Sequence, residues 1–347
     1  MTDAELRAVS FIVPSGFDDP QRASGGNVYD RRVSDGLSRL GWTVRMSQVH
    51  VDDPSTVHSV LSQVSDGELV LIDGLIAGRA PAAVEIASLR LPVVVLAHMA
   101  SGAFEDADPA LIEGERRSLR SARQVIATSD WTRSELVRRR VVAADRIIVA
   151  TPGADDAPMS TGTSAGGALL CVGVVAPHKG QDTLVEALAT LCPDHEWTCT
   201  IAGSLDTRPD FAEQVERLAT MSGIRDRVTM PGVLAADELD RAYRGADLLV
   251  APSRSESYGM VIADALRRGI PVVASDVGGI PQTVASSRAA ILVPPNQPKA
   301  LSDALRRWMV DPALRARLAA DARRAGSHLP RWSDTVARIA QALAGVR

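Results

Sequence analysis

Residues 247–266 read DLLVAPSRSESYGMVIADAL, an apolar run followed by a polar loop and an amphipathic stretch. The apolar run predicts a buried parallel strand, and the stretch after the loop predicts a helix that starts near Tyr258 or Gly259. Glu256 then lies in the loop at the mouth of the helix. Asp264 lies inside the helix, roughly 10 Å further along its axis. A strand, a loop and a helix in this order are the repeating unit of a parallel α/β sheet.

The same unit recurs along the whole chain. A small, glycine-rich stretch at 160–167 separates two series and is typical of a linker. We therefore expect an α/β protein with two doubly wound, Rossmann-like domains at 1–155 and 165–325, facing a cleft that holds the ligand, and a last helix at 330–347. The strands are predicted at 7–13, 43–46, 68–72, 92–97, 124–127 and 146–150, and then at 168–172, 198–201, 227–230, 247–251, 271–274 and 289–293.

The composition is that of an ordinary globular protein. Of 347 residues, 46% are apolar and 23% are charged, which excludes disordered and low-complexity classes. The 38 basic and 42 acidic residues give a net charge of −4, which argues against a nucleic-acid partner. Three cysteines without CxxC spacing argue against a disulfide framework and structural zinc. With no secretory signal and no apolar run of about 20 residues, the sequence predicts a cytoplasmic protein.

A second loop of interest reads VGVVAPHKG at 172–180. A predicted strand ends at Gly173 and a helix begins near Gln181, so Lys179 lies beyond the carboxyl end of a strand. Lys179 is one of only two lysines in the chain, and a lysine is a compact cation suited to phosphate. The residues alone leave a plainer interpretation open, in which Lys179 is solvated, Glu256 caps a helix and Asp264 is a surface charge.

Together these segments resemble the retaining glycosyltransferases of family 4, which have the GT-B fold. The hallmark of that family is an acid, seven residues and a second acid, which Glu256 and Asp264 match. GIPVVA at 269–274, VGGIP at 277–281 and Lys179 also match. The resemblance implies transfer of a sugar from a nucleoside-diphosphate sugar to a small-molecule or lipid acceptor with retention of configuration, without a metal or a cofactor. It also places the last helix on the N-terminal domain.

The resemblance implies a role for each matching residue. Glu256 would bind hydroxyls of the donor sugar, and Lys179 would meet the diphosphate. His98, which follows a buried strand, would lie against the transferred sugar. Asp264 would bind the ribose, and the glycine pair after the first strand would let the backbone approach the donor. The full set implied for donor binding is Gly25, Gly26, Arg254, Ser257, Tyr258, Gly259, Met260, Asp264, Gly232 and Val233.

Some positions depart from the family pattern. Val174 replaces an arginine, for which Arg254 is a candidate substitute, and Asp264 and Gln282 replace glutamates. Two other functions therefore stay open, a nucleotide-sugar epimerase on the same fold and a non-catalytic nucleotide-sugar binder.

Two further features of the sequence each allow a functional interpretation and a purely structural one. Asp106 and Asp108 form a D-x-D pattern, which can hold a divalent cation, but an acidic loop is the favoured interpretation. An arginine series could meet acidic lipid headgroups and bring the protein to a membrane surface. A salt-paired surface helix is favoured instead, because the first domain is net acidic. The series comprises Arg116, Arg117, Arg120 and Arg123.

Overall fold

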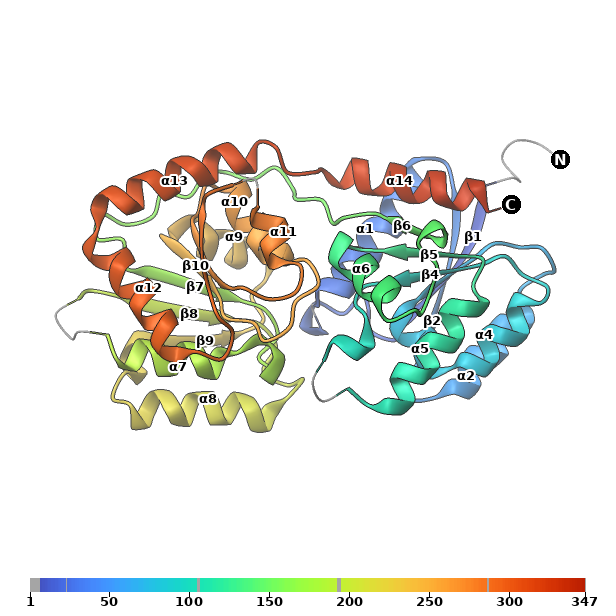
Figure 1. Ribbon diagram of the computed structural model, residues 1–347, viewed down its shortest axis with the longest axis horizontal. Helices are drawn as coiled ribbons and strands as arrows, with labels where there is room; N and C mark the ends of the chain where they lie inside the picture. Colours follow the sequence, from blue (N-terminus) through green and yellow to red (C-terminus); the bar gives the residue numbers. More distant parts are fainter. Residues whose placement is uncertain (1–6, 23, 105–106, 192–194, 286, 347) are drawn as a thin grey trace. The chain divides into compact units, whose positions relative to one another are not determined.

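The computed structural model describes residues 7–22, 24–104, 107–191, 195–285 and 287–346 (Figure 1). The chain divides into two compact units. Unit 1 comprises Met1–Asp19, Gly25–Gly153 and Pro330–Arg347, and unit 2 comprises Pro20–Ser24 and Ala154–Leu329. None of the helices in the described ranges is both long enough and apolar enough to span a membrane.

Unit 1 is a six-stranded parallel sheet in the order β2-β1-β3-β4-β5-β6 with helices on both faces. The chain adds strands first on one side of β1 and then on the other, so the winding switches between β1 and β3. The strands are β1 Ala8–Pro14, β2 Thr43–Val49, β3 Val70–Asp73, β4 Val93–Ala97, β5 Gln124–Ala127 and β6 Ile147–Val149. The helices are α1 Gly25–Arg39, α2 Pro54–Gln63, α3 Gly74–Arg79, α4 Pro81–Ser88, α5 Pro109–Ser121, α6 Asp130–Arg138 and α14 Trp332–Gly345.

The strands of unit 1 are apolar on both faces because helices cover both. In β4, Val93, Val95 and Ala97 join the core beneath α2 to α5, whereas Val94 and Leu96 face the core that α1 and α14 cover. This alternation is the two-residue period of a strand. It explains why β4 appears in the sequence as an uninterrupted apolar run rather than as an alternating pattern.

The last helix, α14, belongs to unit 1. Val336, Ile339 and Leu343 lie in the same core as the residues of β1 and α1. Thr335 Oγ1 donates a 2.6 Å hydrogen bond to the carbonyl of Thr151. The structure thus places the C-terminal helix on the N-terminal part of the fold, as expected.

Unit 2 repeats the architecture with a six-stranded parallel sheet in the order β12-β11-β10-β7-β8-β9. Its winding switches between β7 and β10, which pair in parallel. The strands are β7 Ala168–Val172, β8 Thr198–Ala202, β9 Val228–Gly232, β10 Leu248–Ala251, β11 Val272–Ser275 and β12 Ala290–Val293. The helices are α7 Gln181–Ala189, α8 Pro209–Met221, α9 Ala236–Gly245, α10 Met260–Arg267, α11 Ile280–Val284, α12 Pro298–Val310 and α13 Pro312–Gly326.

The predicted fold class of two doubly wound α/β sheets is confirmed. The stretch predicted as a linker differs from expectation, because much of it is fixed to unit 2. Ser160 Oγ donates to the carbonyl of Ala246 at 2.7 Å, and Thr163 N–H and Oγ1 each donate to Asp247 at 2.6 Å. Small polar side chains here satisfy backbone and carboxylate groups, which composition alone does not distinguish from a solvated linker.

Candidate functional site

Two loops of unit 2 meet at the switch point between β7 and β10. Because the strands are parallel neighbours, the loops that follow them leave the same edge of the sheet. The N–H groups of Arg254 and Ser255 donate to the carbonyl of His178 at 2.8 and 3.3 Å and join the loops. Lys179 Nζ then lies 2.6 Å from Glu256 Oε2. The structure therefore brings together the lysine and the acid singled out by the sequence.

Glycines make the close approach of these loops possible. Gly180 has a φ of +69°, and a Cβ there would lie 2.2 Å from the carbonyl oxygen of Pro252. Gly278 has a φ of +60°, and a Cβ there would lie 1.9 Å from the carbonyl oxygen of Glu256. Glycine alone satisfies both the dihedral and the contact at each position. The backbone that carries Glu256 is therefore held against the 277–279 turn.

The Lys179–Glu256 pair is largely withdrawn from water, with side chains 23% and 12% exposed. Burial alone would raise the pKa of Glu256, but the charge and hydrogen bond of Lys179 outweigh it, so this pKa is lowered. Burial, Lys179 and Arg208 together lower the pKa of His178 to about 4 against a weaker opposing effect of Glu256. At neutral pH the site thus holds an ionised acid, a cation and a neutral imidazole.

Arg254 is held by several contacts inside unit 2. Its Nη1 and Nη2 bind the two carboxylate oxygens of Asp182, each at 2.9 Å. The remaining N–H groups donate to Thr183 Oγ1, Asn296 Oδ1 and the carbonyl of Pro177. All five guanidinium donors are thereby used inside unit 2. We expect these bonds to position the loop that carries Glu256, and the role of Arg254 at the donor phosphate stays a prediction.

Helix α10 carries the rest of the motif. Gly259 caps the helix, and Met260 is its first residue. The ring of Tyr258 is buried, and burial together with the charge of Asp264 raises its pKa to about 12. Burial and Asp264 also raise the pKa of Tyr243 well above its ordinary value, so the Asp264 carboxylate lies near both rings. The backbone of Tyr258 is engaged as well, because its carbonyl accepts a hydrogen bond from Thr283 Oγ1 and its N–H binds the Glu256 carboxylate.

The remaining donor-binding candidates of unit 2 lie on two loops. Ser257 N–H donates to Glu256 Oε1 at 3.2 Å, which fixes that residue beside the acid. Gly232 ends β9, and its carbonyl accepts a 2.9 Å hydrogen bond from Gly203 N–H. Val233 follows it and is half-buried.

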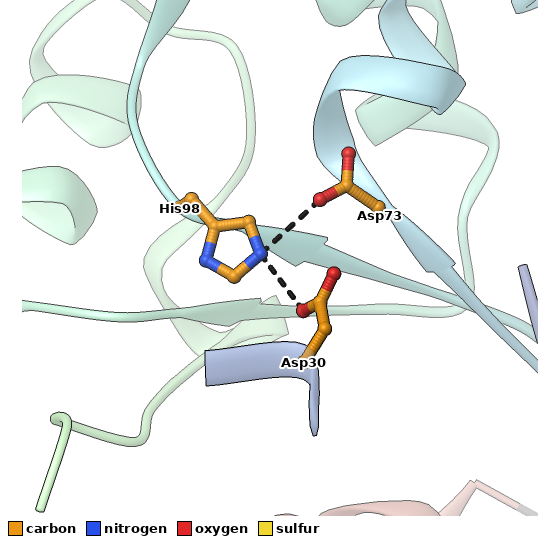
Figure 2. A group of neighbouring side chains, drawn as sticks. All are labelled: Asp30, Asp73 and His98. Carbon is orange, nitrogen blue, oxygen red and sulfur yellow. Dashed lines mark hydrogen bonds and ion pairs between the residues drawn. The ribbon is translucent and has the colours of Figure 1, made fainter. Parts of the chain in front are cut away.

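A second cluster lies at the carboxyl ends of the strands of unit 1. Figure 2 shows His98, which follows β4, with Asp30 of α1 and Asp73 of β3 on one side of its ring. His98 Nε2 lies 3.0 Å from Asp30 Oδ1 and 3.2 Å from Asp73 Oδ2. The side chains of Asp30 and Asp73 are 0% and 5% exposed, and that of His98 is 22% exposed. The other oxygen of Asp73 caps α3 by accepting from Leu75 N–H at 2.7 Å.

The two acids set the charge of His98. Burial would lower the pKa of His98, but the charges and hydrogen bonds of Asp30 and Asp73 raise it to about 10. Burial raises the pKa of Asp30 to about 6, against the lowering effect of His98. Ligand atoms of all three residues lie within 4.8 Å of one another, so the cluster has the composition of a metal site as well as of a hydrogen-bonded ion cluster.

The two glycines predicted for donor binding lie beside this cluster. Gly25 begins α1, and a Cβ at Gly26 would lie 3.5 Å from Cδ2 of His98. A side chain at Gly26 would therefore lie in ordinary van der Waals contact with the imidazole ring.

Sequence reasoning missed Asp30 and Asp73. One signal was available for each. Asp73 directly follows a buried strand, and Asp30 lies on the apolar side of α1 beside Tyr29 and Val33, which are also buried. A charged residue on a buried helix face requires a partner. The partner itself, His98, was not identifiable because it lies 68 positions away from Asp30 in the chain.

The D-x-D pattern and the arginine series, the two further features of the sequence, have different outcomes. Asp106 of the D-x-D pattern lies outside the described residues, and Asp108 caps α5 by accepting from Ala110 N–H at 2.8 Å. The arginine series is largely paired, as favoured. Arg116 and Arg117 bind Glu113 and Glu85, and Arg120 donates to the carbonyls of Arg140 and Val141.

Substitution of Gly278 by Ala is expected to lower both stability and donor turnover. The new Cβ strains a left-handed backbone and collides with the Glu256 carbonyl, so the loop must shift. We expect a loss of at least about 2 kcal/mol in urea unfolding, because a left-handed alanine alone costs about 1–2 kcal/mol. Gly223→Ala is the matched control, since Gly223 has a φ of +71° with nothing within 4 Å. Equal losses in the two variants would contradict the packing argument.

Comparison with known proteins adds three findings. Residues 166–325 match the model of glycosyl transferases group 1. A D-inositol 3-phosphate glycosyltransferase of Xylanimonas cellulosilytica is 33% identical over 243 residues, covering 65% of this chain and 58% of that protein. An alpha-D-kanosaminyltransferase of Streptomyces kanamyceticus is 30% identical over 253 residues, covering 69% of this chain and 64% of that protein. The matches thus span less than two thirds of these relatives.

Solved structures resemble almost the whole chain. A sucrose-phosphate synthase from Thermosynechococcus elongatus has a TM-score of 0.82 at 23% identity, covering 97% of this chain and 98% of that one. The Anabaena protein Alr3699/HepE in complex with UDP-glucose has a TM-score of 0.80 at 21% identity, covering 97% and 99%. The chain therefore has the GT-B fold of glycosyltransferases, with residues 166–325 matching glycosyl transferases group 1.

Proposed function

We propose that this protein is a retaining glycosyltransferase of family 4 that moves a hexosyl-type sugar from a nucleoside-diphosphate sugar to a small-molecule or lipid acceptor. The observation that carries the proposal is the partly buried Lys179–Glu256 pair at the switch point of the sheet in unit 2. In doubly wound folds, this is the edge at which nucleotides bind. The pair also lies within the residues that match glycosyl transferases group 1.

In unit 2 we assign the donor's charged part to Lys179 and to the first turn of α10. Bond cleavage builds negative charge on the departing diphosphate, and a fixed cation together with helix N–H groups stabilises that charge. Arg208, which contributes to lowering the pKa of His178, is a second cation at this end of unit 2 and compensates for Val174. We therefore propose that transfer needs no metal ion.

The other assignments follow the chemistry of each group. Glu256, ionised at neutral pH, accepts hydrogen bonds from the donor sugar, and Asp264 does so from the ribose. Ser257, Tyr258, Gly259 and Met260 form the segment that meets the donor at the start of α10. Gly232 and Val233 contact the base. In unit 1, we assign His98 to the transferred sugar and the backbone of Gly25 and Gly26 to the donor.

The experiment is a donor screen followed by product analysis. Thermal shift with UDP-, GDP- and ADP-sugars identifies the donor, because binding stabilises the folded chain by mass action. Turnover of that donor, with acceptor or by slow hydrolysis, is then followed by proton NMR, where we expect the anomeric configuration to be retained and EDTA to leave the rate unchanged. Binding without turnover indicates a non-catalytic binder, and a changed sugar without acceptor indicates an epimerase. Either of these results contradicts the proposed transferase activity. An inverted product contradicts retention of configuration, and a rate that EDTA abolishes and only Mn²⁺ restores contradicts transfer without a metal.

We further propose a cytoplasmic location. A lipid acceptor would bring the protein to the membrane surface peripherally, and sedimentation with lipid vesicles tests this association with the membrane.

A further inference from the structure

We propose that Asp30 and Asp73 are positioning residues that keep His98 as an imidazolium, so that its Nδ1–H is a charged hydrogen-bond donor for a hydroxyl oxygen of the bound ligand. The nature of the ligand rests on the proposed function. The charge state of His98 does not, because it follows from residues of unit 1 alone.

The first step of the argument is that one ring nitrogen faces two carboxylates. Nε2 of His98 lies within hydrogen-bond distance of both Asp30 and Asp73. Ionised carboxylates only accept hydrogen bonds, so Nε2 carries the proton of these contacts whenever both acids are ionised. Both acids are almost fully buried, which strengthens their attraction for a positive ring.

The second step concerns the other nitrogen. Figure 2 shows Nδ1 on the side of the ring facing away from both acids, and no hydrogen bond to it is recorded from any residue that the structure describes. Since Nε2 is already protonated, the protonation of Nδ1 decides the chemistry. A neutral ring would present a lone pair and could act as a base. The imidazolium presents a donor and cannot take a proton from an acceptor hydroxyl.

The third step is the net charge of the cluster, which determines the kind of ligand atom that can accept a hydrogen bond from Nδ1. The titratable groups that face His98 are Asp30 and Tyr29 of α1 and Asp73 of β3. Burial raises the pKa of Tyr29 well above its ordinary value, so this residue stays neutral. With both acids ionised, the cluster carries one net negative charge. A phosphate would be repelled by that charge, whereas a neutral hydroxyl oxygen can accept from Nδ1–H without penalty.

The test is NMR of the full chain labelled with ¹⁵N-histidine. The His98→Gln variant identifies the His98 signals among those of the six histidines, and exposed His58 serves as internal reference. We expect both ring nitrogens of His98 to be protonated at pH 7 and at pH 8. Asp30→Asn and Asp73→Asn keep the shape of each acid, and Asn still caps α3. Each variant is expected to lower the pKa of His98 by about 1–3.

Several results would overturn the proposal. These are a neutral His98 at pH 7, a pKa of His98 that neither Asn variant lowers, and a bound metal ion in the purified chain that is lost in His98→Gln. The wild-type spectrum and metal content decide the matter even if an Asn variant does not fold. A protonated His98 in a chain that turns over no sugar nucleotide refutes the proposed function alone. A neutral His98 in an active enzyme refutes this inference alone.

Discussion

Glu256→Gln is expected to reduce turnover of the sugar nucleotide by about 100-fold or more while strengthening the binding of free nucleoside diphosphate. The substitution keeps the shape of the side chain and removes the charge that the donor sugar meets. It also releases Lys179, whose Nζ lies 2.6 Å from the Glu256 carboxylate and must otherwise divide its attraction between this acid and the phosphates. Steady-state kinetics and calorimetric titration with the nucleoside diphosphate measure the two effects separately.

Lys179→Ala is the complementary variant, and it is expected to weaken both donor binding and free diphosphate binding. A charge-assisted contact contributes about 1.5–3 kcal/mol, which corresponds to roughly 10- to 150-fold. Lys299→Ala is the matched control, because the Lys299 side chain is 87% exposed and pairs with Asp303 on the surface of α12. If Glu256→Gln lost diphosphate affinity while Lys179→Ala kept it, the donor would be oriented the opposite way.

His98→Ala is expected to cost about 3–5 kcal/mol of unfolding free energy at pH 7, since it leaves two buried carboxylates without their cation. Urea unfolding measures this loss, and His58→Ala, on the exposed side of α2, is the control. If the loss lay within about 1 kcal/mol of that of the control, the two buried carboxylates would not need His98 to stabilise them.

The pH dependence of this loss has a definite sign. The pKa of His98 is raised to about 10 in the folded chain, so its contribution is complete below the unfolded value of 6.5 and falls as pH rises toward 10. The difference between wild type and His98→Ala should therefore narrow by about 1.4 kcal/mol per pH unit between pH 8 and 10. A constant difference over this range would contradict the assigned protonation.

Much of the fold was predictable because each strand is a short, distinct apolar run. The ranges predicted for β5 and β7 coincide with Gln124–Ala127 and Ala168–Val172, and the last helix, expected at 330–347, is α14. Lys179 and Glu256 were found because each follows a recognisable strand. The sequence does not reveal which residue pairs with each charged side chain. The pairing of the Arg254 guanidinium with Asp182, for example, is visible only in the structure.

The position of α14 bears on the order in which the protein folds during synthesis. Val336, Ile339 and Leu343 are part of the core shared by β1 and α1, yet the ribosome adds them only after the Ala154–Leu329 segment of unit 2. Unit 2 takes almost all of its residues from one continuous segment, Ala154–Leu329. During synthesis the apolar surface of β1 and α1 thus stays uncovered until α14 emerges, so that unit 1 begins before the Ala154–Leu329 segment and is completed after it.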